Sequence, residues 1–143
     1  MNEVFIMSIA RTPIGSLGGV ISTITAPQLG ATVMKAAMLR ANINPDQVQE
    51  VYMGIVLSAN VGQAPAQQAS IAAGIPTNTP CTTINKVCAS GMKSIMLGAQ
   101  SIMTGINDIV VAGGMESMSN TPYYLDRARS GYRYGHAQMI DGI

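Results

Sequence analysis

Charged residues are scarce in this 143-residue sequence: they make up 10% of the chain, and the formal net charge is +1. Proteins that bind a phosphate backbone or an anionic lipid surface carry basic patches, which this composition does not supply. We therefore expect no nucleic-acid partner. Because so little charge leaves a lone domain poorly soluble, we also expect another subunit or more chain to cover part of its surface.

Long hydrophobic runs are missing as well, since no stretch approaches the roughly 20 apolar residues that span a bilayer. No membrane span is therefore expected. Residues 1–10 lead directly into a strand pattern instead of a charged, cleavable leader, so we expect a mature, soluble chain. The 48% hydrophobic content is that of a globular protein with a core of its own, and one compact domain is the default.

Metal ligands and disulfide partners are few, because cysteine occurs only at Cys81 and Cys88 and the single histidine is His136. Two cysteines in a chain with 11 methionines fit a reducing compartment better than a disulfide framework. A tetrahedral zinc site needs a second pair of ligands, which the sequence does not provide. We therefore expect no metal site.

The apolar pattern alternates between strand and helix periods along the chain. This order, βαβαβαβ, predicts an α/β domain in which helices pack on a mixed sheet. The predicted strands are Glu3–Ala10, Val51–Leu57, Thr82–Ile84 and Ile109–Ala112, and the predicted helices cover 25–41, 64–73 and 89–105, with a short helical turn at 44–46.

Helix faces and helix ends can also be predicted. Thr25 can cap the first helix with Gln28 reaching back, and Gly74 can end the second. A face of the first helix is formed by Leu29, Val33, Ala36 and Ala37, and a continuous buried stripe is predicted on the third by Met92, Ile95, Met96, Ala99, Ile102 and Met103. Beyond Ser117 the chain becomes polar and aromatic, so the regular core is expected to end there.

Chemistry concentrates between the third strand and the third helix, in residues 85–93. A cysteine in the first turn of a helix faces unpaired N–H groups and the positive end of the dipole, which stabilise a thiolate. Cys88 is therefore a nucleophile candidate, with the small residues 89–91 leaving room for a carbonyl and its own amide able to donate to an oxyanion. By spacing alone, a buried structural cysteine remains the alternative.

The segment Thr79–Lys93 (TPCTTINKVCASGMK) closely resembles the acyl-enzyme signature of the thiolase family, particularly that of mitochondrial acetyl-CoA acetyltransferases. Three further segments agree in order and spacing: Ala10–Gly15, Gly62–Pro65 and Ala112–Ser119. The resemblance extends from Asn2 to about Tyr124. It implies a thiolase-like layered domain at residues 1–118, followed by the start of a loop or covering region at 119–143.

The resemblance implies acyl transfer between coenzyme A thioesters, with Cys88 carrying the acyl group and no cofactor. Two acetyl-CoA give acetoacetyl-CoA and CoA, reversibly. Family members also need a histidine in Gly-His-Pro, an Asn-Glu motif and a cysteine in Cys-x-Gly, none of which occurs here. These belong to a second, similar domain, because family members are well over twice this length. A homo-oligomer or a complementing C-terminal half is therefore expected, at a mitochondrial or alternatively a cytoplasmic location.

Other residues are assigned more modest roles. We expect Cys81 to pack as a small hydrophobe, Gly113 and Gly114 to let backbone pass close to the Cys88 loop, and Glu116 and Ser117 to support that turn. His136 matches a covering-loop position and either touches substrate or lies on the surface. Lys93 is expected in solvent, Lys86 stays open, and Gln67 replaces an arginine usual in the family.

Two hypotheses follow from the sequence. In the first, the chain is part of a working thiolase, and Cys88 is acylated when the other half is present. In the second, it is a non-catalytic, thiolase-derived structural or interaction subunit whose tail docks on a larger assembly. The intact surroundings of Cys88 favour the first, and the missing motifs favour the second.

Overall fold

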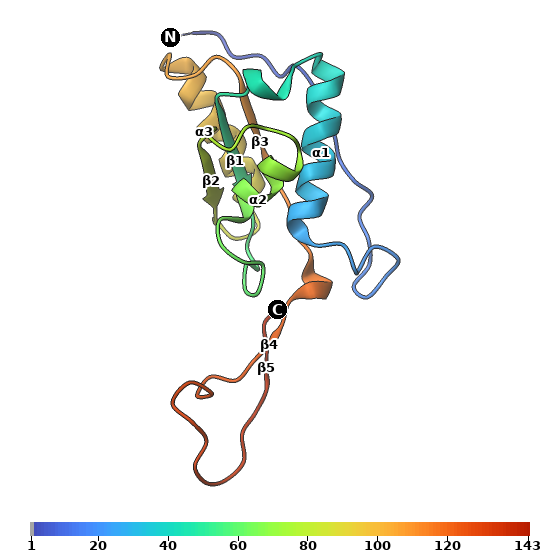
Figure 1. Ribbon diagram of the computed structural model, residues 1–143, viewed down its shortest axis with the longest axis vertical. Helices are drawn as coiled ribbons and strands as arrows, with labels where there is room; N and C mark the ends of the chain where they lie inside the picture. Colours follow the sequence, from blue (N-terminus) through green and yellow to red (C-terminus); the bar gives the residue numbers. More distant parts are fainter. Residues whose placement is uncertain (1) are drawn as a thin grey trace.

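A computed structural model describes residues 2–143 as an α/β body with a projecting arm (Figure 1). The layered α/β class predicted from the sequence is confirmed. The helices are α1 (Ala26–Ala41), α2 (Pro65–Ala72) and α3 (Ser90–Met103), with 3-10 turns η1 (Pro45–Gln47) and η2 (Met118–Asn120). The strands are β1 (Glu50–Gly54), β2 (Cys81–Ile84), β3 (Val110–Gly114), β4 (Tyr123–Tyr124) and β5 (Ile140–Asp141).

The main sheet has three parallel strands in the order β2-β1-β3. In its register, Val51 of β1 lies opposite Cys81 of β2 and Val111 of β3. Side chains alternate across a strand, so Val51 and Met53 join the core that α1 and α2 close. On the other face Tyr52 lies against α3. Helices therefore cover both faces of the sheet.

Helix α1 begins and ends as the sequence predicts. Thr25 Oγ1 accepts from the Gln28 N–H at 3.4 Å, and Gln28 Oε1 accepts from the Thr25 N–H at 3.0 Å, which completes a capping box. Asn42, with φ of 55°, ends the helix in the left-handed region. The buried face lies one position away from the predicted one, because Met34 and Met38 point into the core.

The strand predicted at Glu3–Ala10 is not formed, so that prediction is wrong for this chain. The segment runs extended along the surface, tied by Asn2 N–H to Met103 O at 3.2 Å and by Ser8 Oγ to Ala37 O at 2.6 Å. A strand requires a ladder of bonds to a neighbour, and within residues 2–143 none of the strands pairs with this segment. The side chains of Phe5, Ile6, Met7 and Ile9 are consequently exposed.

The apolar stripe predicted to be buried on α3 faces outward instead. Met92 is 68% exposed, and Ile95 and Met96 are each 50% exposed. The buried residues of α3 are small ones: Ser90, Ser94, Gly98 and Ser101. They allow close packing on the sheet, where a Cβ added at Gly98 would lie 3.1 Å from Val110 Cγ1. The helical period was predicted correctly, and the face that packs on the sheet was not.

Residues 121–143 form an arm that leaves the body and returns toward it (Figure 1). Its only regular structure is the antiparallel pair β4–β5, with Tyr123 opposite Asp141. Nearly all of its side chains are exposed, and Tyr132 Oη donates to Asp126 Oδ1 at 2.9 Å. No helix in the part of the chain that the structure describes is long and apolar enough to cross a bilayer.

Candidate active site

Cys88 lies in a tight turn between β2 and α3. The turn begins at Asn85, whose Oδ1 accepts from the Val87 N–H at 3.0 Å. Helix α3 begins at Ser90, so Cys88 precedes the helix. The sequence had suggested that Cys88 lies in the first turn, and that prediction is wrong. The left-handed Val87 causes this difference, because it folds the chain back on itself before helical geometry can start.

Val87 has a φ of 49°, which is unusual for a residue with a branched Cβ. Such a conformation costs about 1–3 kcal/mol and persists only where neighbours hold it. Here the buried Ser90 hydroxyl does so: it donates to Val87 O at 2.5 Å and accepts from the Lys86 N–H at 2.9 Å. The turn raises Cys88 away from the core, and its side chain is exposed.

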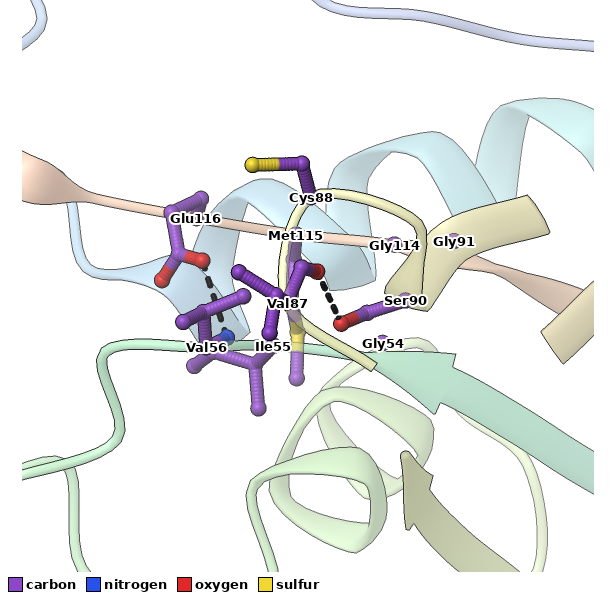
Figure 2. A pocket seen from close by; sticks show the side chains of 10 residues that line it. All are labelled: Gly54, Ile55, Val56, Val87, Cys88, Ser90, Gly91, Gly114, Met115 and Glu116. Atoms are coloured by element: carbon purple, nitrogen blue, oxygen red, sulfur yellow. Dashed lines mark hydrogen bonds between the residues drawn. The ribbon is translucent and has the colours of Figure 1, made fainter. Parts of the chain in front are cut away.

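An open hollow of about 300 Å³ lies beside this turn. Figure 2 shows the Cys88 side chain at its rim, with the sulfur directed away from α3 and toward the side on which Glu116 lies. The ends of β1 and β3 and the turn before α3 contribute the lining: Gly54, Ile55, Val56, Val87, Cys88, Ser90, Gly91, Gly114, Met115 and Glu116. This lining offers one nucleophile and, within residues 2–143, no imidazole that could act as its base.

Glycines bring the start of α3 against the carboxyl ends of the strands. A Cβ added at Gly114 would lie 3.1 Å from Gly91 Cα, so the predicted close approach is confirmed there. A Cβ added at Gly113 would instead meet Met53 Sδ, at 3.5 Å. The tightest glycine beside the hollow is Gly54, where a Cβ would lie 2.5 Å from the Ser90 carbonyl carbon. Sequence reasoning missed Gly54, although a glycine inside the strand predicted at Val51–Leu57 was an available signal.

Glu116 and Ser117, which were predicted to support the Cys88 turn, make long-range hydrogen bonds to other segments instead. The half-buried Glu116 carboxylate accepts from the Val56 N–H at 2.9 Å and from the Leu57 N–H at 3.2 Å. Bonds to a charged acceptor contribute about 1.5–3 kcal/mol each. Ser117 Oγ donates to Ile24 O at 2.8 Å, and so fastens the loop before α1.

Cys81 is half-buried and packs against the core, as expected. Its thiol donates to Thr79 O at 3.3 Å. Burial raises the pKa of the Cys81 thiol; the Ser70 hydroxyl lowers it, and the charge of Glu50 raises it further. Burial therefore favours the protonated thiol, which is a poor nucleophile. The two cysteines thus differ in exposure and in the chemistry open to them.

The remaining residues singled out from the sequence lie away from the hollow. His136 is exposed on the arm, and Gln67 is partly buried in α2. Lys86 is exposed, while Lys93 is half-buried on α3, less open to solvent than predicted. None of these four side chains lines the hollow.

Comparison with known proteins gives a family for this arrangement. Residues 4–143 match the family described as "Thiolase, N-terminal domain". In structure, the chain is similar to the Acat5 thiolase from Ascaris suum, solved in complex with coenzyme A. The TM-score is 0.92 at 44% sequence identity, over 96% of this chain and 35% of that one.

Curated relatives are similar over almost the whole chain. Acetyl-CoA acetyltransferase 2 of Arabidopsis thaliana is 59% identical over 99% of this chain and 35% of its own length. The mitochondrial acetyl-CoA acetyltransferase B of Xenopus laevis is 58% identical over 100% and 34%. A cytosolic acetyl-CoA acetyltransferase of Gibberella zeae is 56% identical over 98% and 35%. The chain thus spans about a third of the length of the relatives it matches.

Proposed function

This chain belongs to the thiolase family, and we propose that Cys88 is the nucleophile that carries the acyl group. The Cys88 thiolate attacks the carbonyl carbon of an acyl-CoA, the bond from that carbon to the CoA sulfur breaks, and CoA leaves as a thiol after taking up a proton. A base takes a proton from the Cα of a second acetyl-CoA, and the resulting carbanion attacks the carbonyl carbon of the acyl group, so that the bond from this carbon to the Cys88 sulfur breaks. Acetoacetyl-CoA forms, and the Cys88 sulfur is released.

The observation that carries this proposal is the placement of Cys88, exposed on a strained turn at the rim of a hollow. A structural cysteine would be packed, as Cys81 is. Relatives named acetyl-CoA acetyltransferase and a similar thiolase solved with coenzyme A support acetyl-CoA and CoA as the ligands. Acetyl-CoA C-acetyltransferase activity is accordingly the function we assign to the complete assembly.

We further propose that a C-terminal half supplies the base and the second thiol of the family's motifs. The exposed apolar face of α3, formed by Met92, Ile95 and Met96, supports this, because such a surface is costly to leave in water. In this arrangement residues 1–118 form the N-terminal thiolase domain, and 119–143 begin the region that covers the site.

Intact mass spectrometry tests the acyl-enzyme. The chain is combined with the C-terminal segment of the Arabidopsis relative that it does not cover, and acetyl-CoA is added. We expect one acetyl adduct on the wild type and none on Cys88→Ala, with Cys81→Ala as the matched control that keeps the adduct. No adduct on wild type in this assembly would reject the proposal in favour of a non-catalytic subunit.

Assembly and location are proposed on narrower grounds. We infer a homo-oligomer from the edge strand β2, whose Thr82 and Thr83 side chains are exposed. A mass by light scattering equal to one assembled copy would contradict it. We propose the mitochondrion as the compartment, with the cytoplasm as the alternative, because similar relatives are found in both. Subcellular fractionation of the native protein decides between them.

A further inference from the structure

Glu116 occupies the point where the ladder between β1 and β3 ends. The last backbone bond there runs from the Met115 N–H to Gly54 O at 2.9 Å. Beyond the end of β1, the N–H groups of Val56 and Leu57 donate to the Glu116 carboxylate. A side chain thus replaces the carbonyls that a longer strand would offer, and it does so across 60 positions of sequence.

The residue that Glu116 holds is connected to the nucleophile turn. Asn85 Nδ2 donates to Val56 O at 3.5 Å, while Asn85 Oδ1 accepts from the Val87 N–H at 3.0 Å. Val87 is the left-handed residue directly before Cys88. A continuous path therefore runs from Glu116 through Val56 and Asn85 to the backbone that presents the sulfur.

We propose that Glu116 is a positioning residue for the acyl-transfer step: through Val56 and Asn85 it fixes Cys88 relative to the wall of the hollow. This proposal rests on the proposed function, since it assumes that Cys88 is acylated. Val56 and Glu116 both line the hollow, so the path also holds the surface against which an acyl donor is oriented. Glu116 does not act on the reacting atoms itself.

The test uses Glu116→Gln in the assembly with the complementing C-terminal segment. The amide keeps the shape of the carboxylate but can accept from only one of the two N–H groups. We expect acetylation of Cys88 to slow about tenfold, the loss that follows from one charge-assisted bond. Alkylation of Cys88 by iodoacetamide, which needs no oriented donor, should keep its wild-type rate.

Glu50→Gln is the matched control, because Glu50 begins the same strand and accepts from Asn107 at its opposite end. It should acetylate at the wild-type rate. Asn85→Ala breaks the path on the other side of Val56, so it should slow acetylation as well. Combined with Glu116→Gln, it should add little, whereas independent effects would multiply to about a hundredfold.

A wild-type acetylation rate in Glu116→Gln, a multiplicative double variant, or a parallel loss of alkylation would each overturn the proposal. If Glu116→Gln does not fold, Asn85→Ala alone decides, and a wild-type rate there has the same consequence. Failure of the proposed function looks different: wild-type Cys88 is then alkylated by iodoacetamide but takes no acetyl group.

Discussion

Helices α1 and α3 flank the same sheet by opposite means. Helix α1 turns large side chains inward, with Met34 only 1% exposed, and its side of the molecule is closed. Helix α3 turns Ser94 and Gly98 inward and leaves Met96 outside. Large residues fill a core, whereas small ones let backbones approach. The second arrangement brings the Cys88 turn against the strand ends and leaves an apolar face uncovered.

The largest effect is expected on the closed side. Met34→Ala removes a fully buried side chain that the surrounding core cannot replace, so the free energy of unfolding should fall by about 2–5 kcal/mol. Urea denaturation followed by circular dichroism measures it. A loss below about 1 kcal/mol would show that the α1 side is not the closed core described here.

A second substitution tests the close contact between the end of β1 and the start of α3. Gly54→Ala places a methyl group 2.5 Å from the Ser90 carbonyl carbon, and such overpacking costs about 1–3 kcal/mol. Because Ser90 holds the turn, the alkylation rate of Cys88 should change together with stability. Gly91→Ala is the control: its methyl would make only ordinary contacts, the nearest at 3.6 Å. Equal effects of the two substitutions would contradict the tight contact at Gly54.

Alkaline pH should reveal the burial of Cys81 on the closed side. Its pKa is raised in the folded state above the ordinary value of 9.0, chiefly by burial. The folded state therefore holds the proton more tightly than the unfolded one. This contribution is complete below about pH 9 and is lost as the pH rises through the folded-state pKa. Between pH 8 and pH 10, the free energy of unfolding of Cys81→Ala, measured by denaturation, should accordingly decline less steeply than that of the wild type.

The smallest effect on stability is expected for the corresponding methionine-to-alanine substitution on α3. Met96→Ala truncates a half-exposed side chain, so the isolated chain should change in stability by no more than about 0.5 kcal/mol. In the assembly with a C-terminal segment, the same substitution should weaken association, measured by titration calorimetry. Unchanged association would show that this face is not the one covered.

Local features of the fold could be predicted from the sequence because they depend on few neighbours. The Thr25 capping box, the end of α1 at Asn42 and the helical period of α3 are of this kind. The strand expected at Glu3–Ala10 failed because pairing depends on a neighbour distant in the sequence. The prediction of the inward face of α3 was wrong because a hydrophobic stripe indicates a face that is covered, but does not indicate whether the sheet or another part of the assembly covers it.

The candidate site was predicted unevenly for similar reasons. Cys88 stood out by its motif, and Gly114 by its doublet, whereas Gly54 and the path from Glu116 to Asn85 depend on distances across the fold. No pattern along the chain indicates that residues 60 positions apart share hydrogen bonds. The motif therefore singled out Cys88 as the proposed nucleophile, and the three-dimensional structure was needed to find what holds its turn.

Because Gly54 and Ser90 are in close contact, the side-chain sizes that fit at these two distant positions depend on each other. A Cβ at Gly54 would lie 2.7 Å from the Ser90 Cβ, so a bulkier residue at either position claims room already taken by the other. Threonine could keep the hydroxyl that Ser90 supplies, but its added methyl would need space at the same narrow place. Positions 54 and 90 should therefore change together, or not at all, as sequences of this kind diverge.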